Sequence, residues 1–115
     1  MAWIAVRIHG PVREVLRSWP VPVRKELGTI LTRLQKQESI GMPDIRAMPG
    51  IGRGISEIRI PERGGAYRAF YMIQSELGIL LFHAFQKKGR KTPEREKRIA
   101  RRRLGAFLNE LGVKN

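Results

Sequence analysis

The sequence contains no cysteine, which excludes disulfide bonds and metal sites built from thiolates. This absence fits a reducing compartment, and we expect the protein in the cytoplasm. No apolar run approaches the roughly 20 residues that a membrane-spanning helix needs. The first ten residues alternate in polarity and include Arg7 and His9, a pattern unlike a signal peptide. We therefore expect a protein that does not enter a membrane.

Acidic residues are scarce. The 115-residue chain has 10 Asp and Glu against 23 Lys and Arg, a formal net charge of +13. Such an excess predicts affinity for RNA, DNA, an acidic protein or an anionic membrane, and charge alone does not choose among them. We favour nucleic acid, with a merely solvated basic surface as the alternative. Hydrophobic residues make up 42%, enough for one folded domain over residues 1–115.

Hydrophobic spacing and chain breakers predict the secondary structure. Apolar alternation indicates a first strand over residues 3–8, and helical spacing indicates two short helices over residues 12–19 and from Val21 onward. A short edge strand is expected over residues 44–48, between two prolines. Three strands joined by short turns follow, over residues 55–60, 66–73 and 79–85. A final basic helix begins at Thr92-Pro93, with Thr92 as its N-cap.

The predicted order is β-α-α-β-β-β-β-α. It corresponds to an α+β fold in which an N-terminal helical hairpin and a C-terminal helix pack on an antiparallel sheet. Side chains alternate between the two faces of a strand. If both hairpins are tight, one face gathers the polar and aromatic side chains of Glu57, Arg59, Arg68, His83 and Phe85, opposite Phe82 and Ala84. A slip of one residue in either hairpin would scatter them.

This face has the groups needed to cleave RNA without a metal. The planar guanidinium of Arg68 suits phosphate oxygens, and His83 or Glu57 can move protons near neutral pH. Lys87 and Lys88 can hold phosphates or stabilise the leaving oxygen, and Phe85 offers a ring for base stacking. The sequence has no spaced set of His, Asp and Glu ligands, so we expect no metal and no cofactor.

The same residues also have structural interpretations. Glu57, Arg59 and Arg68 can form a ladder of salt bridges across a solvated face. His83, between apolar neighbours, fits a half-buried, hydrogen-bonded histidine, and Phe85 fits a core or rim residue. The basic segment from Lys87 to Arg103 fits contact with phosphate or with an acidic partner better than it fits a solvated helix.

Several marks between Met42 and Pro93 resemble the RelE/ParE toxin superfamily, in its phage-derived, HigB-like branch. They combine short apolar strands with charged residues, in a fixed order and at fixed spacing. They are Met42-Pro43-Asp44, Glu57-Ile58-Arg59-Ile60, Tyr67-Arg68-Ala69-Phe70-Tyr71, His83-Ala84-Phe85-Gln86-Lys87-Lys88 and Lys91-Thr92-Pro93. The helix that contains Glu96, Ala100 and Arg103 continues the match. The β-α-α start agrees as well, so the resemblance spans most of the chain.

The resemblance implies the toxin of a type II toxin–antitoxin pair. RelE-like members bind at the ribosome and cut mRNA there without a metal. Their partner is a cognate antitoxin, here expected to be an acidic or helix-turn-helix DNA-binding protein. By analogy, Arg68 stabilises the scissile phosphate, Arg59, Lys87 and Lys88 grip the RNA, and Glu57 and His83 are candidates for proton transfer. We also expect Lys87 to take part in catalysis, and Phe85 and Lys91 to contact RNA.

The sequence also departs from the family pattern. Several RelE-like members carry a catalytic tyrosine near the C-terminus, and no tyrosine follows Tyr71 in this chain. Two alternatives stay open: a ParE-like toxin that poisons DNA gyrase without cutting RNA, and a basic nucleic-acid-binding module without activity.

Overall fold

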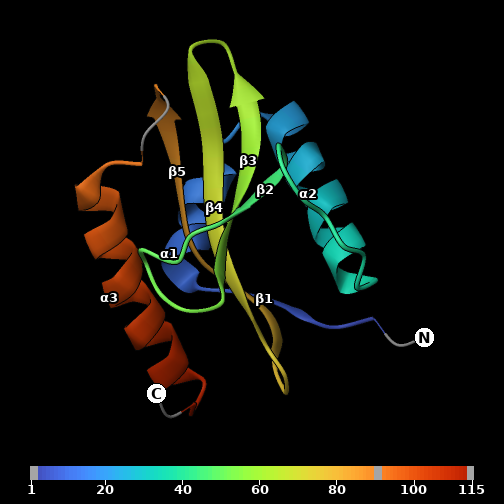
Figure 1. Cartoon of the computed structure of the whole chain (residues 1–115), viewed down its shortest axis with the longest axis vertical. Helices are drawn as coiled ribbons and strands as arrows, with labels where there is room; N and C mark the ends of the chain where they lie inside the picture. Colours follow the sequence, from blue (N-terminus) through green and yellow to red (C-terminus); the bar gives the residue numbers. More distant parts are fainter. Residues whose placement is uncertain (1–2, 90–91, 114–115) are drawn as a thin grey trace.

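The computed structural model describes residues 3–89 and 92–113, and Figure 1 shows three helices around a central five-stranded sheet. The chain order is the predicted β-α-α-β-β-β-β-α. The elements are β1 (Val6–Ile8), α1 (Gly10–Arg17), α2 (Val21–Gln35), β2 (Ile45–Ala47), β3 (Ile55–Glu62), β4 (Gly65–Gln74), β5 (Gly78–Lys88) and α3 (Glu94–Glu110).

The strands lie in the order β1-β5-β4-β3-β2. The pairs β2–β3, β3–β4 and β4–β5 are antiparallel, and β2 is an edge strand, as predicted. The predicted antiparallel meander is confirmed, and the structure adds one parallel pair that was not predicted, between β1 and β5 at the other edge. No hairpin joins these two strands, because α1, α2 and the meander separate them in the chain, so no turn fixes their relative direction.

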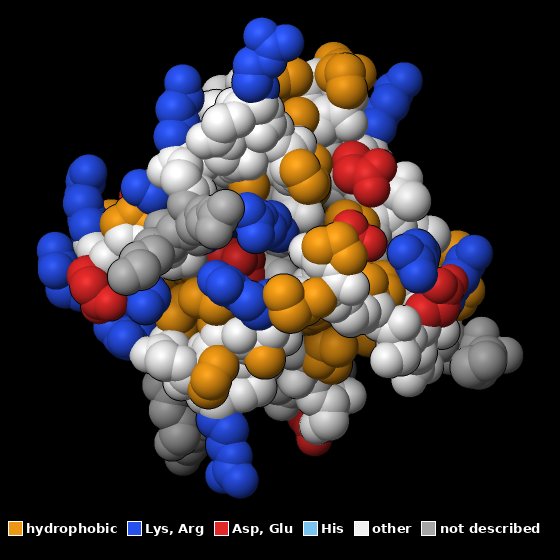
Figure 2. Space-filling view, turned by 45° about the horizontal axis from the view of Figure 1, so that its top comes forward, with side chains coloured by type: hydrophobic (Ala, Val, Ile, Leu, Met, Phe, Trp, Pro, Cys, Tyr) orange, Lys and Arg blue, Asp and Glu red, His pale blue; other side chains and the backbone are white. Residues whose placement is uncertain are grey.

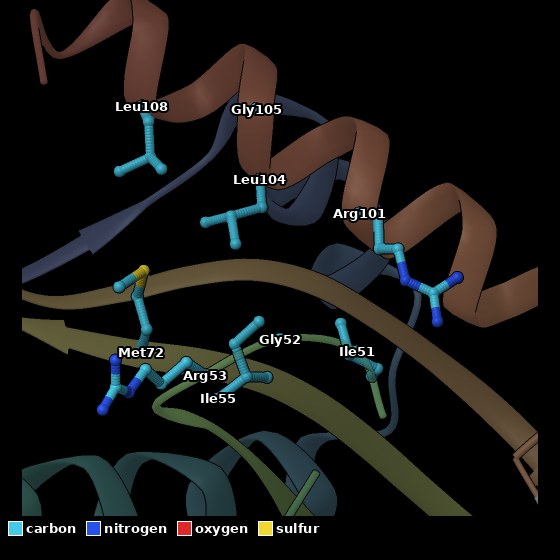
Figure 3. Close-up of a pocket in the computed structure, with 9 residues that line it drawn as sticks. All are labelled: Ile51, Gly52, Arg53, Ile55, Met72, Arg101, Leu104, Gly105 and Leu108. Atoms are coloured by element: carbon cyan, nitrogen blue, oxygen red, sulfur yellow. The ribbon is translucent and has the colours of Figure 1, made fainter. Parts of the chain in front are cut away.

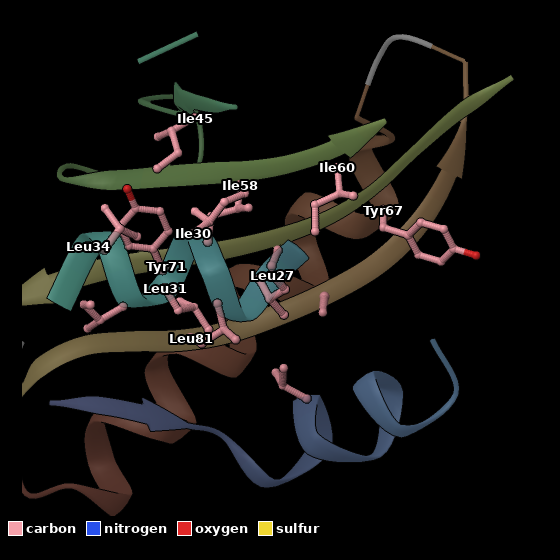
Figure 4. Close-up of a cluster of buried hydrophobic side chains, with 14 of the residues drawn as sticks. Leu27, Ile30, Leu31, Leu34, Ile45, Ile58, Ile60, Tyr67, Tyr71 and Leu81 are labelled. Carbon is pink, nitrogen blue, oxygen red and sulfur yellow. The ribbon is translucent and has the colours of Figure 1, made fainter. Parts of the chain in front are cut away.

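Helices α1 and α2 cover one face of the sheet, and Figure 4 shows the apolar cluster between them and the strands. The apolar stripe of α2 that the sequence predicts supplies Leu27, Ile30, Leu31 and Leu34, all of them buried. Alternate residues of β3, β4 and β5 pack against this stripe, among them Ile58, Ile60, Tyr67, Tyr71 and Leu81. This confirms the helical hairpin as the cover of one face.

Helix α3 covers the opposite face (Figure 1). Its buried residues Ala100, Phe107 and Leu108 pack in one cluster with Phe70 and Phe82 of the sheet. The face on which the polar residues were expected is therefore the face beneath α3. Polar side chains on this face lie between the sheet and α3, so the packing of α3 sets how much of each side chain is exposed to solvent.

A β-bulge in β5 changes one predicted orientation. Phe70 pairs with His83 and Tyr71 with Leu81, which leaves Phe82 as an extra residue on β5. Simple alternation would place Phe82 opposite His83. The extra residue instead brings Phe82 into the cluster beneath α3, so that prediction is wrong. Ala84 lies on the α2 side as expected.

Two glycines at strand ends permit a tight turn and a close approach of two backbone segments. The β3–β4 hairpin turns through Arg63 and Gly64, and Gly64 has φ +79°, a conformation that favours glycine. Gly78 opens β5 with φ +96°, and a Cβ on it would lie 2.3 Å from the backbone oxygen of Ala5. Gly78 thus lets the chain before β1 approach β5 closely.

Several elements begin or end at other residues than predicted, β1 and α3 among them. The first strand begins at Val6 instead of residue 3, because only Val6–Ile8 pair with β5. Helix α3 has Pro93 as its N-cap and no capping side chain. Thr92 is not the cap because its hydroxyl is engaged with side chains of the sheet. Within the described residues, no helix combines the length and the apolar character that a membrane crossing requires.

Candidate nucleic-acid interface

The register of the hairpins brings the predicted site residues onto one face. Arg59 pairs with Arg68, and Arg68 pairs in turn with Phe85. Glu57 pairs with Phe70, which pairs with His83. Since directly paired residues point the same way, Glu57, Arg59, Arg68, His83 and Phe85 share the face beneath α3. The predicted convergence is confirmed.

At the centre of this face lies a buried ion pair. Arg68 Nη1 is 3.6 Å from Glu57 Oε2, and both side chains are 0% exposed. Thr92 links the pair to the start of α3, because Arg68 Nη1 donates to Thr92 Oγ1 at 2.9 Å and this hydroxyl donates to Glu57 Oε2 at 3.2 Å. Arg68 Nη2 also donates to the backbone oxygen of Gly89 at 3.3 Å. The network ties β3, β4 and the segment before α3 together.

This burial corrects two expectations of exposure. Arg68 and Glu57 were expected at an open surface in contact with RNA, yet neither side chain reaches solvent. The salt-bridge interpretation describes them better, although the pair is buried and not solvated. Burial lowers the pKa of the Arg68 guanidinium, and the neighbouring Glu57 carboxylate opposes that shift. Their predicted catalytic roles stay predictions, and direct contact with phosphate is not available to them in this arrangement.

Arg46 joins the network from the edge strand and was missed in the sequence. It pairs with Glu57 in the β2–β3 register, and its Nη2 lies 3.5 Å from Glu57 Oε1. Its side chain is 40% exposed, so it connects the buried carboxylate to the surface. The signal was available in principle, because an arginine in a short edge strand next to a strand that carries glutamate favours a cross-strand pair.

His83 is buried and hydrogen-bonded through both ring nitrogens. Nε2 is 2.7 Å from Glu96 Oε1, and Nδ1 is 3.1 Å from Arg103 Nη1. A guanidinium can only donate, so Nδ1 accepts and the proton of the neutral ring lies on Nε2, directed at the Glu96 carboxylate. Burial lowers the pKa of His83 below its ordinary value of 6.5, although Glu96 opposes the shift.

This arrangement fits the structural interpretation of His83. Glu96, not His83, is the group of this pair that meets solvent, with 21% of its side chain exposed against 3% for the histidine. Glu96 and Arg103 were not among the predicted site residues. Their spacing of seven residues, two turns on one helix face, was the available signal. The role of His83 in proton transfer stays a prediction.

Phe85 is placed differently from the expected stacking surface. Its side chain is buried, and its ring lies edge-on to Phe70 at 5.5 Å between centroids and 5.4 Å from the ring of His83. It belongs to the apolar cluster beneath α3. Phe85 is therefore a core residue, as the structural interpretation proposed, because α3 packs over this part of the sheet.

The cations at the end of the sheet remain accessible. Arg59 and Lys87 are half-buried, Lys88 is exposed, and Figure 2 shows Lys and Arg side chains standing around this end of the molecule. Lys87 pairs with Ala66 and Lys88 with Gly65. Adjacent strand residues point to opposite faces, so only one of these two lysines can share the face of Arg68. Lys91, also predicted to bind RNA, lies outside the described residues.

Alternation along β5 decides which lysine that is. Phe85 shares the face of Arg68, with which it pairs, and Lys87 follows Phe85 by two residues. Lys87 therefore lies on the face of Arg68, and Lys88 points to the other face.

The comparisons with known proteins agree with this architecture. A family model described as "Phage derived protein Gp49-like (DUF891)" matches residues 14–105. The chain belongs to this family. A solved structure of the Escherichia coli toxin RelE, a double arginine-to-alanine mutant in the free state, is similar in fold, with a TM-score of 0.53. It is 20% identical, and the match covers 73% of this chain and 82% of that one.

A search of curated proteins finds no match to this sequence. The Gp49-like family and the RelE-like fold together confirm the resemblance to the RelE/ParE toxin superfamily drawn from the sequence motifs. Members of one superfamily can differ in target, so the reaction has to be argued from the site.

Proposed function

We propose that this Gp49-like protein is the toxin of a type II toxin–antitoxin pair and that it inhibits translation by cleaving mRNA on the ribosome without a metal. The observation that carries the proposal is the partly exposed carboxylate of Glu96, which is hydrogen-bonded to His83 on the same sheet face that carries Arg59 and Lys87. A protein that only binds RNA needs cations but has no use for an oriented, partly exposed carboxylate on the same face.

In the proposed reaction, the ribose 2′-oxygen attacks the adjacent phosphorus. Its proton passes to the Glu96 carboxylate, the bond from phosphorus to the 5′-oxygen breaks, and a 2′,3′-cyclic phosphate and a 5′-hydroxyl result. The leaving 5′-oxygen takes its proton from the Lys87 ammonium or from water. His83 positions Glu96 by donating to it, and Arg103 keeps the His83 proton on Nε2.

Accessible cations stabilise the charge that builds on the phosphate. Arg59 and Lys87 share the reacting face, and one well-aimed charge at a developing oxyanion contributes roughly 3 kcal/mol. Lys88, on the opposite face of the strand, holds RNA farther along its path. These contacts are made by side chains that reach solvent, unlike those of Arg68 and Phe85.

Arg68 and Glu57 act in this proposal as positioning residues. They hold the hydroxyl of Thr92, which precedes α3 by two residues, and Glu96 lies in the first turn of that helix. The buried pair therefore fixes the carboxylate relative to the sheet. A shift of about 1 Å in such a group is enough to reduce a rate strongly.

The test is a purified translation system in which mRNA 5′ ends are mapped after the protein is added. We expect new ends within translated codons. The control Arg24→Ala removes an exposed cation of α2, far from the site, whereas Arg59→Ala removes one on the reacting face. Cleavage should fall for Arg59→Ala only. Intact mRNA together with gyrase-linked DNA breaks would refute the nuclease and support the gyrase alternative.

A further inference from the structure

A pocket of about 340 Å³ lies between α3 and the segment that leads into β3, away from the reacting carboxylate. Figure 3 shows its lining, in which Leu104 and Leu108 of α3 face Met72 and Ile55 of the sheet. Its volume is within the range of small ligand sites. Met72 and Leu104 are only partly buried, so the pocket is open to solvent and not a sealed packing defect.

Gly105 of α3 is one of the residues that line the pocket. A Cβ on Gly105 would meet nothing within 4 Å, so a larger residue has room there. Glycine in a helix interior is less favourable than alanine by about 1 kcal/mol, and at Gly105 it leaves the helix beside the pocket without a side chain. The empty space beside Gly105 fits a side chain that arrives from another molecule.

Cations lie at both ends of the apolar lining. Figure 3 shows Arg53 and Arg101 at opposite sides of the view, with Ile55 and Leu104 between them. Both arginines are exposed, and Arg101 Nη2 donates to the backbone oxygen of Gly50 at 2.6 Å. Because this hydrogen bond already orders Arg101, less side-chain freedom is lost when a ligand binds.

The lining decides between RNA and protein as the occupant. RNA bases bind by stacking on aromatic rings, and the residues around this pocket include none. Aliphatic walls between two cations instead suit a leucine-like side chain flanked by Asp or Glu. The excess of 23 basic over 10 acidic residues in the whole chain attracts such a segment from a distance.

We propose that this pocket anchors an acidic segment of the cognate antitoxin through one large aliphatic side chain. The proposal rests on the toxin assignment above. Gly105 lies nine residues after Glu96 on α3, about 13 Å along the helix at 1.5 Å per residue. The anchor is therefore separate from the cleavage site, and a change in the pocket should weaken antitoxin binding while RNA cleavage continues.

The test compares Gly105→Leu, which adds a large side chain to the lining of the pocket, with Gly28→Leu. Gly28 also lies inside a helix, and a Cβ added there would meet nothing within 4 Å, but it is on the exposed face of α2. Both variants gain helix propensity. The dissociation constant for the antitoxin encoded beside the gene should rise about tenfold or more for Gly105→Leu only. Arg53→Glu should also weaken binding and reduce its dependence on salt.

Equal affinity of Gly105→Leu and the parent would overturn the proposal. Should Gly105→Leu fail to fold, Gly105→Ala and hydrogen exchange of the parent complex decide. Gly105→Ala should bind the antitoxin more weakly than the parent does, and amides of residues 101–108 should gain protection in the parent complex. Absence of both effects overturns the anchor. Cleavage on ribosomes by the free chain is measured in parallel. Cleavage without antitoxin binding refutes the anchor alone, and pocket protection without cleavage refutes the nuclease alone.

Discussion

Arg68 and Glu57 form an ion pair at 3.6 Å in which neither side chain is exposed to solvent. Removing one partner of such a pair leaves the other charge buried and uncompensated, which typically costs about 3–5 kcal/mol. The pair also holds Thr92, so its loss should loosen the start of α3. Loss of the pair should therefore lower stability first, and affect catalysis only through the position of α3.

We predict that Arg68→Ala lowers the free energy of unfolding by about 3 kcal/mol or more, whereas Arg59→Ala, at a half-buried position in the neighbouring strand, changes it far less. Urea unfolding followed by circular dichroism measures both. A double variant Glu57→Leu/Arg68→Met should be less destabilised than the sum of the single changes, because no unpaired buried charge is left and Arg46 is partly exposed to solvent. Unchanged stability of Arg68→Ala with lost cleavage would mean that Arg68 contacts RNA directly.

The pKa of His83 predicts a pH dependence of stability. Burial lowers this pKa in the folded chain, so below its ordinary value of 6.5 the unfolded chain binds the proton first. Stability contributed by the neutral histidine is therefore present above that pH and is lost as the pH falls. The free energy of unfolding should drop more between about pH 7.5 and about pH 5.5 for the parent than for His83→Gln. Parallel pH curves for the two proteins would contradict this.

The register predicts different roles for two adjacent lysines. Lys87 shares the reacting face, and Lys88 points away from it. Each phosphate contact of single-stranded RNA contributes about 0.7 to the slope of log affinity against log salt concentration. Lys87→Ala should reduce that slope and the cleavage rate together, while Lys88→Ala should leave the cleavage rate of bound RNA nearly unchanged. Fluorescence anisotropy and single-turnover cleavage separate the two effects, and equal losses of cleavage rate would refute the assigned faces.

Much of the architecture could be predicted because it follows from local patterns. The alternation in β3 and β4 and the short turns fixed the face that holds Glu57, Arg59 and Arg68, and the apolar stripe of α2 predicted its cover. The pairing of β1 with β5 could not be predicted, since it joins segments more than 70 residues apart with no hairpin between them. The bulge at Phe82 was hidden for a similar reason, because strand periodicity does not reveal an unpaired residue.

The burial of individual site residues was the main property that could not be predicted from the sequence. Whether Arg68 and Phe85 face solvent depends on where α3 docks, which is a tertiary contact and not a property of their strands. The same contact created the part of the site that was missed, since Glu96 and Arg103 reach His83 only after α3 has packed on the sheet. Charged residues in the strands pointed to the right face, but the accessible carboxylate on that face comes from the helix.

The most direct measurement of the central claim is the rate of mRNA cleavage on translating ribosomes by Glu96→Gln, compared with Glu94→Gln. The two glutamates lie in the same helical turn, but Glu94 is exposed and pairs with Lys97, whereas Glu96 accepts from His83. A glutamine keeps the size of the side chain and an oxygen for His83 but cannot take a proton. We predict a loss of about 10²–10⁴-fold for Glu96→Gln and little change for Glu94→Gln. Cleavage by Glu96→Gln at the parental rate would contradict the account.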